Sequence, residues 1–237
     1  MEAVCIYPSR FRGFASIPTS APEKAADELE HRVREDGFVG AVINGRIRGR
    51  YLDDVFFWPI LERAEELHVP IDLHPTPPPQ PVIDASYTGN FSAEVTNVFS
   101  TNGWGWHIET AVHVLRLILS GAFDKYPELQ LIIGHLGEAL PFMLARIDQN
   151  LSRDVTMLDL PLASYLRENI YYTFSGFNFT PAFLDLLLEV GVDRIMFSVD
   201  YPYRSMASSR SFLDQLPVSS ADRRRIAHRN AECLLRL

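Results

Sequence analysis

The amino-acid sequence predicts an α/β fold in which a parallel sheet of the barrel type is covered by helices. Two observations carry this prediction. Short apolar runs of strand length alternate with longer amphipathic runs, and several of the apolar runs end on residues that bind metals or transfer protons. The carboxyl ends of parallel strands are where barrel enzymes keep such residues. At 237 residues the chain has the size of one barrel domain, so we expect a single domain over residues 1–237.

Six short apolar runs are predicted to be strands, and the amphipathic runs between them are predicted to be helices. Thr180 before Pro181 is an expected N-cap, as is Ser219 or Ser220 for the last helix. The strands cover residues 10–18, 38–44, 70–75, 129–136, 170–176 and 194–200. The helices cover residues 21–36, 58–67, 108–126, 138–151, 180–191 and 219–237.

Residues 76–106 interrupt this alternation because they are rich in Pro, Ser, Thr, Asn and Gly. Such a composition is typical of a loop. The segment directly follows a predicted strand, so it is expected at the carboxyl-end face of the sheet. We therefore predict an inserted loop that forms a lid or a wall over the active-site face.

The composition excludes several classes of protein. The chain is 47% apolar and 22% charged, with a net charge of −8, which argues against nucleic acid or an anionic membrane as a partner. No apolar stretch has the length of a membrane span, and the amino terminus lacks a signal-peptide pattern. The two cysteines, Cys5 and Cys233, form no disulfide or zinc spacing, so a cytoplasmic location is expected.

Three predicted strands end on residues suited to catalysis, namely His74, His135 and Asp200. Side chains on three separate strands converge only at the carboxyl edge of a closed or strongly twisted sheet. Each residue also has a purely structural interpretation: His74 can bond a loop carbonyl, and Asp200 can open a turn. Glu138, three residues after His135, either favours a helix N-terminus or holds the His135 imidazole in one tautomer. His107, beside Trp106, is a candidate for the pocket wall.

Together these motifs resemble a known family. The segments "PIDLHP", "LIIGHLGEALPFMLARID", "ENIYYTFSG" and "RIMFSVDYPY", preceded by "RFRGFASIP", resemble the amidohydrolase-related decarboxylases over essentially the whole chain. This group contains the aminocarboxymuconate-semialdehyde, γ-resorcylate and 2,3-dihydroxybenzoate decarboxylases. The resemblance implies a distorted (β/α)8 barrel that holds one divalent metal ion, zinc or manganese. It implies His74 and Asp200 as metal ligands and His135 with Glu138 as an active-site pair.

The resemblance also implies how substrate and subunits are arranged. Tyr203 would form part of the aromatic pocket, and Trp106 and His107, at the end of the inserted loop, are independent candidates to contact a small aromatic carboxylic acid. The family forms homodimers or homotetramers, and Arg146 matches the position of an arginine that reaches a neighbouring subunit's pocket. The expected reaction is metal-dependent, non-oxidative decarboxylation of a hydroxybenzoate-type acid, in which Asp200 delivers the proton while His135 and Glu138 adjust the proton supply.

One departure from the family pattern affects these expectations. The first family strand carries a Glu-x-His or His-x-His motif, which does not occur before residue 10, and six predicted strands are two short of a closed barrel. We therefore expect an incomplete barrel that binds metal weakly and shows little or no decarboxylase activity. Two alternatives stay open: a metal-dependent hydrolase of a lactone or amide, and a truncated, non-catalytic remnant. Product analysis and a metal assay distinguish them.

Overall fold

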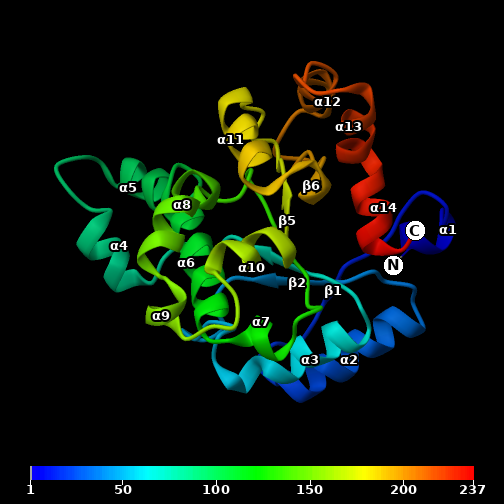
Figure 1. Ribbon diagram of the computed structural model, residues 1–237, viewed down its shortest axis with the longest axis horizontal. Helices are drawn as coiled ribbons and strands as arrows, with labels where there is room; N and C mark the ends of the chain where they lie inside the picture. Colours follow the sequence, from blue (N-terminus) through cyan, green and yellow to red (C-terminus); the bar gives the residue numbers. More distant parts are fainter. Residues whose placement is uncertain (1) are drawn as a thin grey trace.

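A computed structural model describes residues 2–237 and contains one sheet of six parallel strands in the order β1 to β6 (Figure 1). The sheet is open, with β1 and β6 as its edges, as expected for an incomplete barrel. All six predicted strands are confirmed, although each is shorter than predicted. The strands are β1 (Ala15–Ser16), β2 (Ala41–Asn44), β3 (Ile71–His74), β4 (Leu131–Ile133), β5 (Ile170–Thr173) and β6 (Ile195–Met196).

The predicted helices are present between the strands. The helix predicted over 108–126 is divided because Gly121 adopts a left-handed conformation, with φ of 75°. Ser219 caps the terminal helical region as predicted, but the Thr180 prediction is wrong, since Phe179 holds the N-cap position without a side-chain bond. These helices are α2 (Pro22–Arg34), α3 (Trp58–Glu66), α6 (Gly105–Leu119), α7 (Ala122–Lys125), α8 (Leu140–Asn150), α11 (Thr180–Val190), α13 (Ser220–Arg224), η3 (Arg225–Arg229) and α14 (Asn230–Leu235).

Further short helices lie in regions where the sequence pattern predicted none. Two of them are discussed next. The others are α1 (Glu2–Ile6), η1 (Val55–Phe57), α9 (Arg153–Thr156), α10 (Leu162–Glu168), η2 (Val192–Arg194) and α12 (Met206–Asp214). Of these, α10 contributes Leu162, Ala163, Tyr165 and Leu166 to the hydrophobic core. None of the helices within residues 2–237 is both long enough and apolar enough to cross a bilayer.

Residues 76–106, which we call the arm, are not the plain loop that their composition predicts. They contain α4 (Gln80–Ser86) and α5 (Ala93–Ser100), which project to one side of the sheet in Figure 1. Ser92 caps α5 by accepting a hydrogen bond from the Val95 amide. No residue of α4 is buried. The arm leaves the sheet and returns to it at its two roots, near residues 76 and 106, and its residues Tyr87 and Ser100 are buried.

The two faces of the sheet differ in character. In β2 and β3 the buried residues alternate, so that Ile71 and Leu73 face the helical layer while Asp72 and His74 lie on the opposite face. Burial raises the pKa of Asp72 to about 6, and the neighbouring His74 charge opposes this. His74 is the last residue of β3, so on this face of the sheet it lies at the carboxyl edge, where the site is predicted.

His113 provides a test of the packing between α6 and the segment after β2. Its side chain is buried, and its Nε2 atom accepts a 2.9 Å hydrogen bond from the Leu52 amide. Burial, helped by the charges of Arg116 and Arg46, lowers the pKa of His113 from 6.5 to about 3. The unfolded chain therefore binds a proton below pH 6.5 that the folded protein excludes, and stability is lost as the pH falls from about 6.5 towards 3.

When the pH is lowered from 7 to 5, His113 gains a proton in the unfolded chain but not in the folded protein. We expect this difference to reduce the free energy of unfolding by about 2 kcal/mol. Urea unfolding at both pH values measures the loss. The control is His113→Gln, which keeps a hydrogen-bond acceptor but does not titrate, so its pH dependence should be smaller by that amount. The same pH dependence in both proteins would show that His113 is not held neutral by the fold.

Candidate functional site

The candidate site lies where β4 ends and the chain turns into α8. Residues 135–139 form five consecutive positions with positive φ, from 47° at His135 to 97° at Gly137. Left-handed conformation costs about 1–2 kcal/mol for each non-glycine residue, and such strain is concentrated at functional sites. The Leu136 amide donates to the Thr173 carbonyl at 2.9 Å, which ties the turn to β5. The turn places the side chains of His135 and Glu138 face to face.

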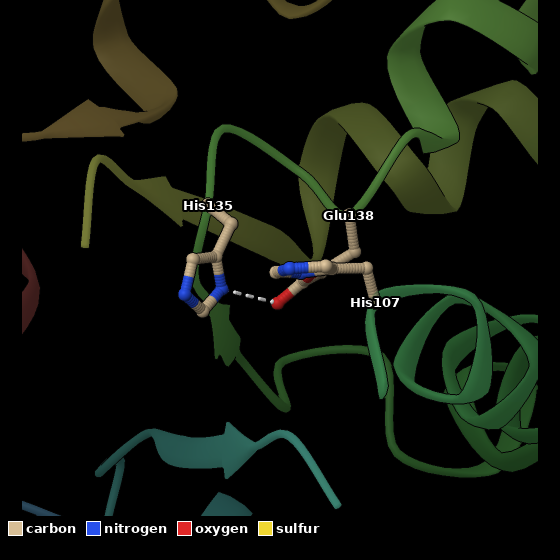
Figure 2. Close-up of side chains that lie close together, drawn as sticks. All are labelled: His107, His135 and Glu138. Atoms are coloured by element: carbon tan, nitrogen blue, oxygen red, sulfur yellow. Dashed lines mark hydrogen bonds and ion pairs between the residues drawn. The ribbon is translucent and has the colours of Figure 1, made fainter. Parts of the chain in front are cut away.

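Glu138 is the centre of this site. Its side chain has no exposed surface, and its two oxygens bind two different imidazoles (Figure 2). His135 Nδ1 donates to Oε1 at 2.8 Å, and His107 Nδ1 donates to Oε2 at 2.5 Å. Burial raises the pKa of Glu138, but the hydrogen bonds from His107 and His135 and the charges of the two rings together outweigh burial, so the net pKa is lowered. A buried carboxylate thus stays ionised because both of its oxygens are paired.

The shared carboxylate fixes the orientation of both histidines. Because each Nδ1 points to Glu138, each ring presents its Nε2 atom away from the carboxylate. This arrangement confirms the interpretation in which Glu138 holds the His135 tautomer. It does not support a role at a helix N-terminus, because α8 begins only at Leu140.

The Nε2 atom of His107 has two neighbours with opposite requirements. The Trp106 Nε1–H can only donate, and it lies 3.0 Å from Nε2, which requires a neutral ring. The Asn102 carbonyl lies 3.2 Å away and can only accept, which requires a proton on Nε2. Burial is the largest single influence and lowers the pKa of His107, but the hydrogen bond to Glu138, the charge of Glu138 and the Asn102 carbonyl together outweigh it, so the net pKa is raised. His107 therefore has a hydrogen-bond partner for Nε2 in either protonation state.

The ligand atoms of His107, His135 and Glu138 all lie within 4.8 Å of one another, a spacing that suits a metal ion. Two imidazoles and a carboxylate match the donor preferences of zinc and manganese. Both Nδ1 atoms already bind Glu138, so an ion between them would replace these two hydrogen bonds. The group is therefore suited either to hold a metal ion or to hold protons beside one.

The predicted metal ligands His74 and Asp200 lie at the same edge of the sheet. His74 is the last residue of β3, and its Nδ1 lies 2.9 Å from the Pro75 carbonyl. This bond is the structural alternative that the sequence suggested, yet it leaves Nε2 available, as in histidines that bind metals. The strand predicted over 194–200 ends at Met196, because its ladder with β5 ends at the pair Thr173–Met196. Asp200 follows in an irregular segment with φ of 64°.

The remaining predicted residues are placed differently. Trp106 touches His107 through its indole nitrogen, which brings it to the site. Tyr203 is 83% exposed, and Arg146 is exposed on α8. The structure does not bring either of them to Glu138, and their roles towards substrate stay predictions. Sequence reasoning missed the His107–Glu138 bond, since its partners lie 31 residues apart.

Comparisons with known proteins show which family and which structures the chain resembles. The family model described as amidohydrolase matches residues 1–237. A γ-resorcylate decarboxylase from Polaromonas sp. is 40% identical over 246 residues, covering 100% of this chain and 73% of that protein. The crystal structure of a dihydroxybenzoic acid decarboxylase from Polaromonas sp., with bound manganese and the inhibitor 2-nitroresorcinol, superposes with a TM-score of 0.90 at 38% identity, covering 100% of this chain and 72% of that one. A 2,6-dihydroxybenzoate decarboxylase from Rhizobium gives a TM-score of 0.88 at 34% identity, covering 99% and 74%.

Proposed function

The chain belongs to the amidohydrolase family, and from this membership we propose that it catalyses the metal-dependent, non-oxidative decarboxylation of a hydroxybenzoate or a related small aromatic acid. The observation that carries the proposal is the buried Glu138, which orients His107 and His135 at the carboxyl edge of the sheet. Relatives that share this chain's fold act on dihydroxybenzoates, and one of them holds manganese.

We propose one divalent ion, manganese or zinc, held by the carboxylate of Asp200 and by Nε2 of His74. When bound, such an ion holds the carboxylate and the ortho oxygen of the substrate and stabilises negative charge. The bond between His74 Nδ1 and the Pro75 carbonyl supports this assignment, because it fixes the ring and leaves Nε2 to face the ion.

The chain's own residues then handle the proton. The carboxyl group of Asp200 donates a proton to the ring carbon that bears the carboxylate, which breaks the aromaticity of the ring. The bond between that carbon and the carboxylate then breaks, its electrons restore the aromatic ring, and carbon dioxide leaves. His135, held by Glu138 through Nδ1, offers Nε2 to return a proton from solvent to Asp200. The reaction consumes one proton for each carbon dioxide released.

Product analysis tests this proposal. With 2,6-dihydroxybenzoate and excess Mn²⁺, we expect equal amounts of carbon dioxide and resorcinol. A set of lactone and amide substrates serves as the comparison, because a metal-dependent hydrolase would release a new acid group from one of them without carbon dioxide. Hydrolysis without carbon dioxide release would replace the decarboxylase assignment with the hydrolase alternative.

We further propose that the protein acts as a homodimer or homotetramer in the cytoplasm. Two exposed apolar side chains of α8, Phe142 and Met143, support this proposal. They lie on the same helix as the exposed Arg146, which would then approach a neighbouring subunit. Light scattering should give the mass of an oligomer, and a monomer at all concentrations would contradict the proposal.

A further inference from the structure

We propose that Arg46, acting through Glu109, is a positioning residue that fixes the two roots of the arm and thereby sets the place of His107 relative to His74. The inference deepens the proposed function, because the site that Arg46 positions is the proposed one. It is carried by contacts that join three segments far apart in the sequence.

The guanidinium of Arg46 reaches both roots of the arm at once. Arg46 lies two residues after β2, at the carboxyl edge of the sheet. Its Nε donates to Oε1 of Glu109 at 2.7 Å, and its Nη2 donates to the Pro77 carbonyl at 2.8 Å. Pro77 begins the arm, three residues after His74, and Glu109 follows its end, two residues after His107. The Arg46 side chain therefore connects the segment that follows His74 to the helix that carries His107.

The ion pair is well enclosed. The side chains of Arg46 and Glu109 are 16% and 8% exposed. The Tyr51 hydroxyl donates to the same Oε1 atom at 2.7 Å, so that one carboxylate oxygen receives two donors. A buried charge that loses its partner is strongly unfavourable, which keeps the pair together. Only the planar guanidinium presents donors in two fixed directions, and a lysine at this position would reach one partner.

A second set of contacts fixes the chain beside Arg46. The Gly45 amide donates to the His74 carbonyl at 3.1 Å. A Cβ atom at Gly45 would lie 2.0 Å from Cγ2 of Thr76, so the first root of the arm packs directly on this glycine. The segment that carries Arg46 is therefore held against residues 74–77, and any shift of Arg46 is transmitted to His74.

The helix α6 transmits the position of Glu109 to His107. Both residues lie in its first two turns, and Thr110 Oγ1 donates to the Trp106 carbonyl at 2.8 Å, which stiffens the helix start. One face of α6, at positions 109, 113 and 116, binds the segment after β2. Of these three contacts, only the one made by Glu109 has a partner, Arg46, whose side chain also binds the first root of the arm.

The experiment compares Arg46→Lys with the matched control Arg116→Met. Arg116 joins the same two segments through its 2.6 Å bond to Asp53, but it lies two turns further along α6 and its side chain is 47% exposed. The readouts are the ring NMR signals of His107, identified by their absence in His107→Gln, the apparent Mn²⁺ affinity, and kcat and KM for decarboxylation. The melting temperature shows whether each variant is folded.

We expect Arg46→Lys to shift the His107 signals and their titration, and to lower kcat or Mn²⁺ affinity by about tenfold to 100-fold, as loss of an outer hydrogen-bond partner does. Arg116→Met should leave the signals and kcat unchanged. Equal effects in both variants, or unchanged His107 signals in Arg46→Lys, would overturn the inference.

A double variant, Arg46→Met with Glu109→Met, separates positioning from stability. Removing both charges leaves no unpaired charge in the interior, so the double variant should fold. If the pair only stabilises the fold, the His107 signals of this variant return to those of the wild type. If the pair positions the roots of the arm, the His107 signals of the double variant stay shifted from those of the wild type. This result would support the inference even if Arg46→Lys does not fold. The NMR readout needs no turnover, so it also stands if the decarboxylase proposal fails.

Discussion

Replacement of Asp200 by asparagine is expected to lower kcat for decarboxylation by about 10²- to 10⁴-fold while the protein stays folded. Asparagine has nearly the same shape as aspartic acid and retains an oxygen that can face a metal ion, but it has no proton to give to the ring carbon. Steady-state rates with 2,6-dihydroxybenzoate at saturating Mn²⁺ measure the loss, and circular dichroism monitors the fold.

The control for this substitution is Asp193→Asn. Asp193 is an exposed carboxylate that pairs with Arg225, and its loss should leave turnover unchanged. Near-normal turnover by Asp200→Asn would remove Asp200 from the proton transfer. An equal loss in both variants would show that the effect is not specific to the site.

Alanine at His74 and alanine at His135 are expected to have different consequences. His74→Ala removes a proposed metal ligand, so it should weaken Mn²⁺ binding by at least tenfold. His135→Ala removes the proposed proton-transfer group, which is bonded to Glu138, so it should lower turnover while Mn²⁺ binding is retained. Mn²⁺ titration followed by electron paramagnetic resonance gives the affinity of each variant.

His107→Ala completes this comparison, because it distinguishes the two places where an ion could lie. If the cluster of His107, His135 and Glu138 holds the ion, then both His107→Ala and His135→Ala lose Mn²⁺ while His74→Ala retains it. That pattern would reassign the metal ligands. The proposed assignment predicts the reverse pattern.

Alternation of apolar and amphipathic runs was sufficient to predict all six strands and their parallel order. It could not predict where each strand ends. The ladder between β5 and β6 contains only two residue pairs, so Asp200 lies beyond the strand and not at its tip. The helices of the arm were missed because residues rich in proline, serine and asparagine form α4 and α5 through local N-caps and first-turn prolines.

The site itself was predictable only in part. His74, His135 and Asp200 could be found because each lies at the end of a buried apolar run or shortly after it, which is a local signal. The left-handed turn of residues 135–139 has no such signal, since four of its five residues are not glycine. Its conformation depends on the bonds that Glu138 makes to His107 and His135 and on the contact with β5. Likewise, Arg46 and Glu109 lie 63 residues apart, and no local pattern joins them.

In the proposed reaction, a divalent ion at the carboxyl edge of this sheet supports decarboxylation. The most direct test is the rate of carbon dioxide release from 2,6-dihydroxybenzoate as Mn²⁺ is titrated into metal-free protein. Because the sequence offers His74 and Asp200 as the recognisable ligands, we expect no release without metal and a slow release that rises with Mn²⁺ and reaches its maximum only at high concentration. Release that does not depend on metal would disprove this expectation, and tight, stoichiometric Mn²⁺ binding with rapid release would show that ligands other than His74 and Asp200 complete the site.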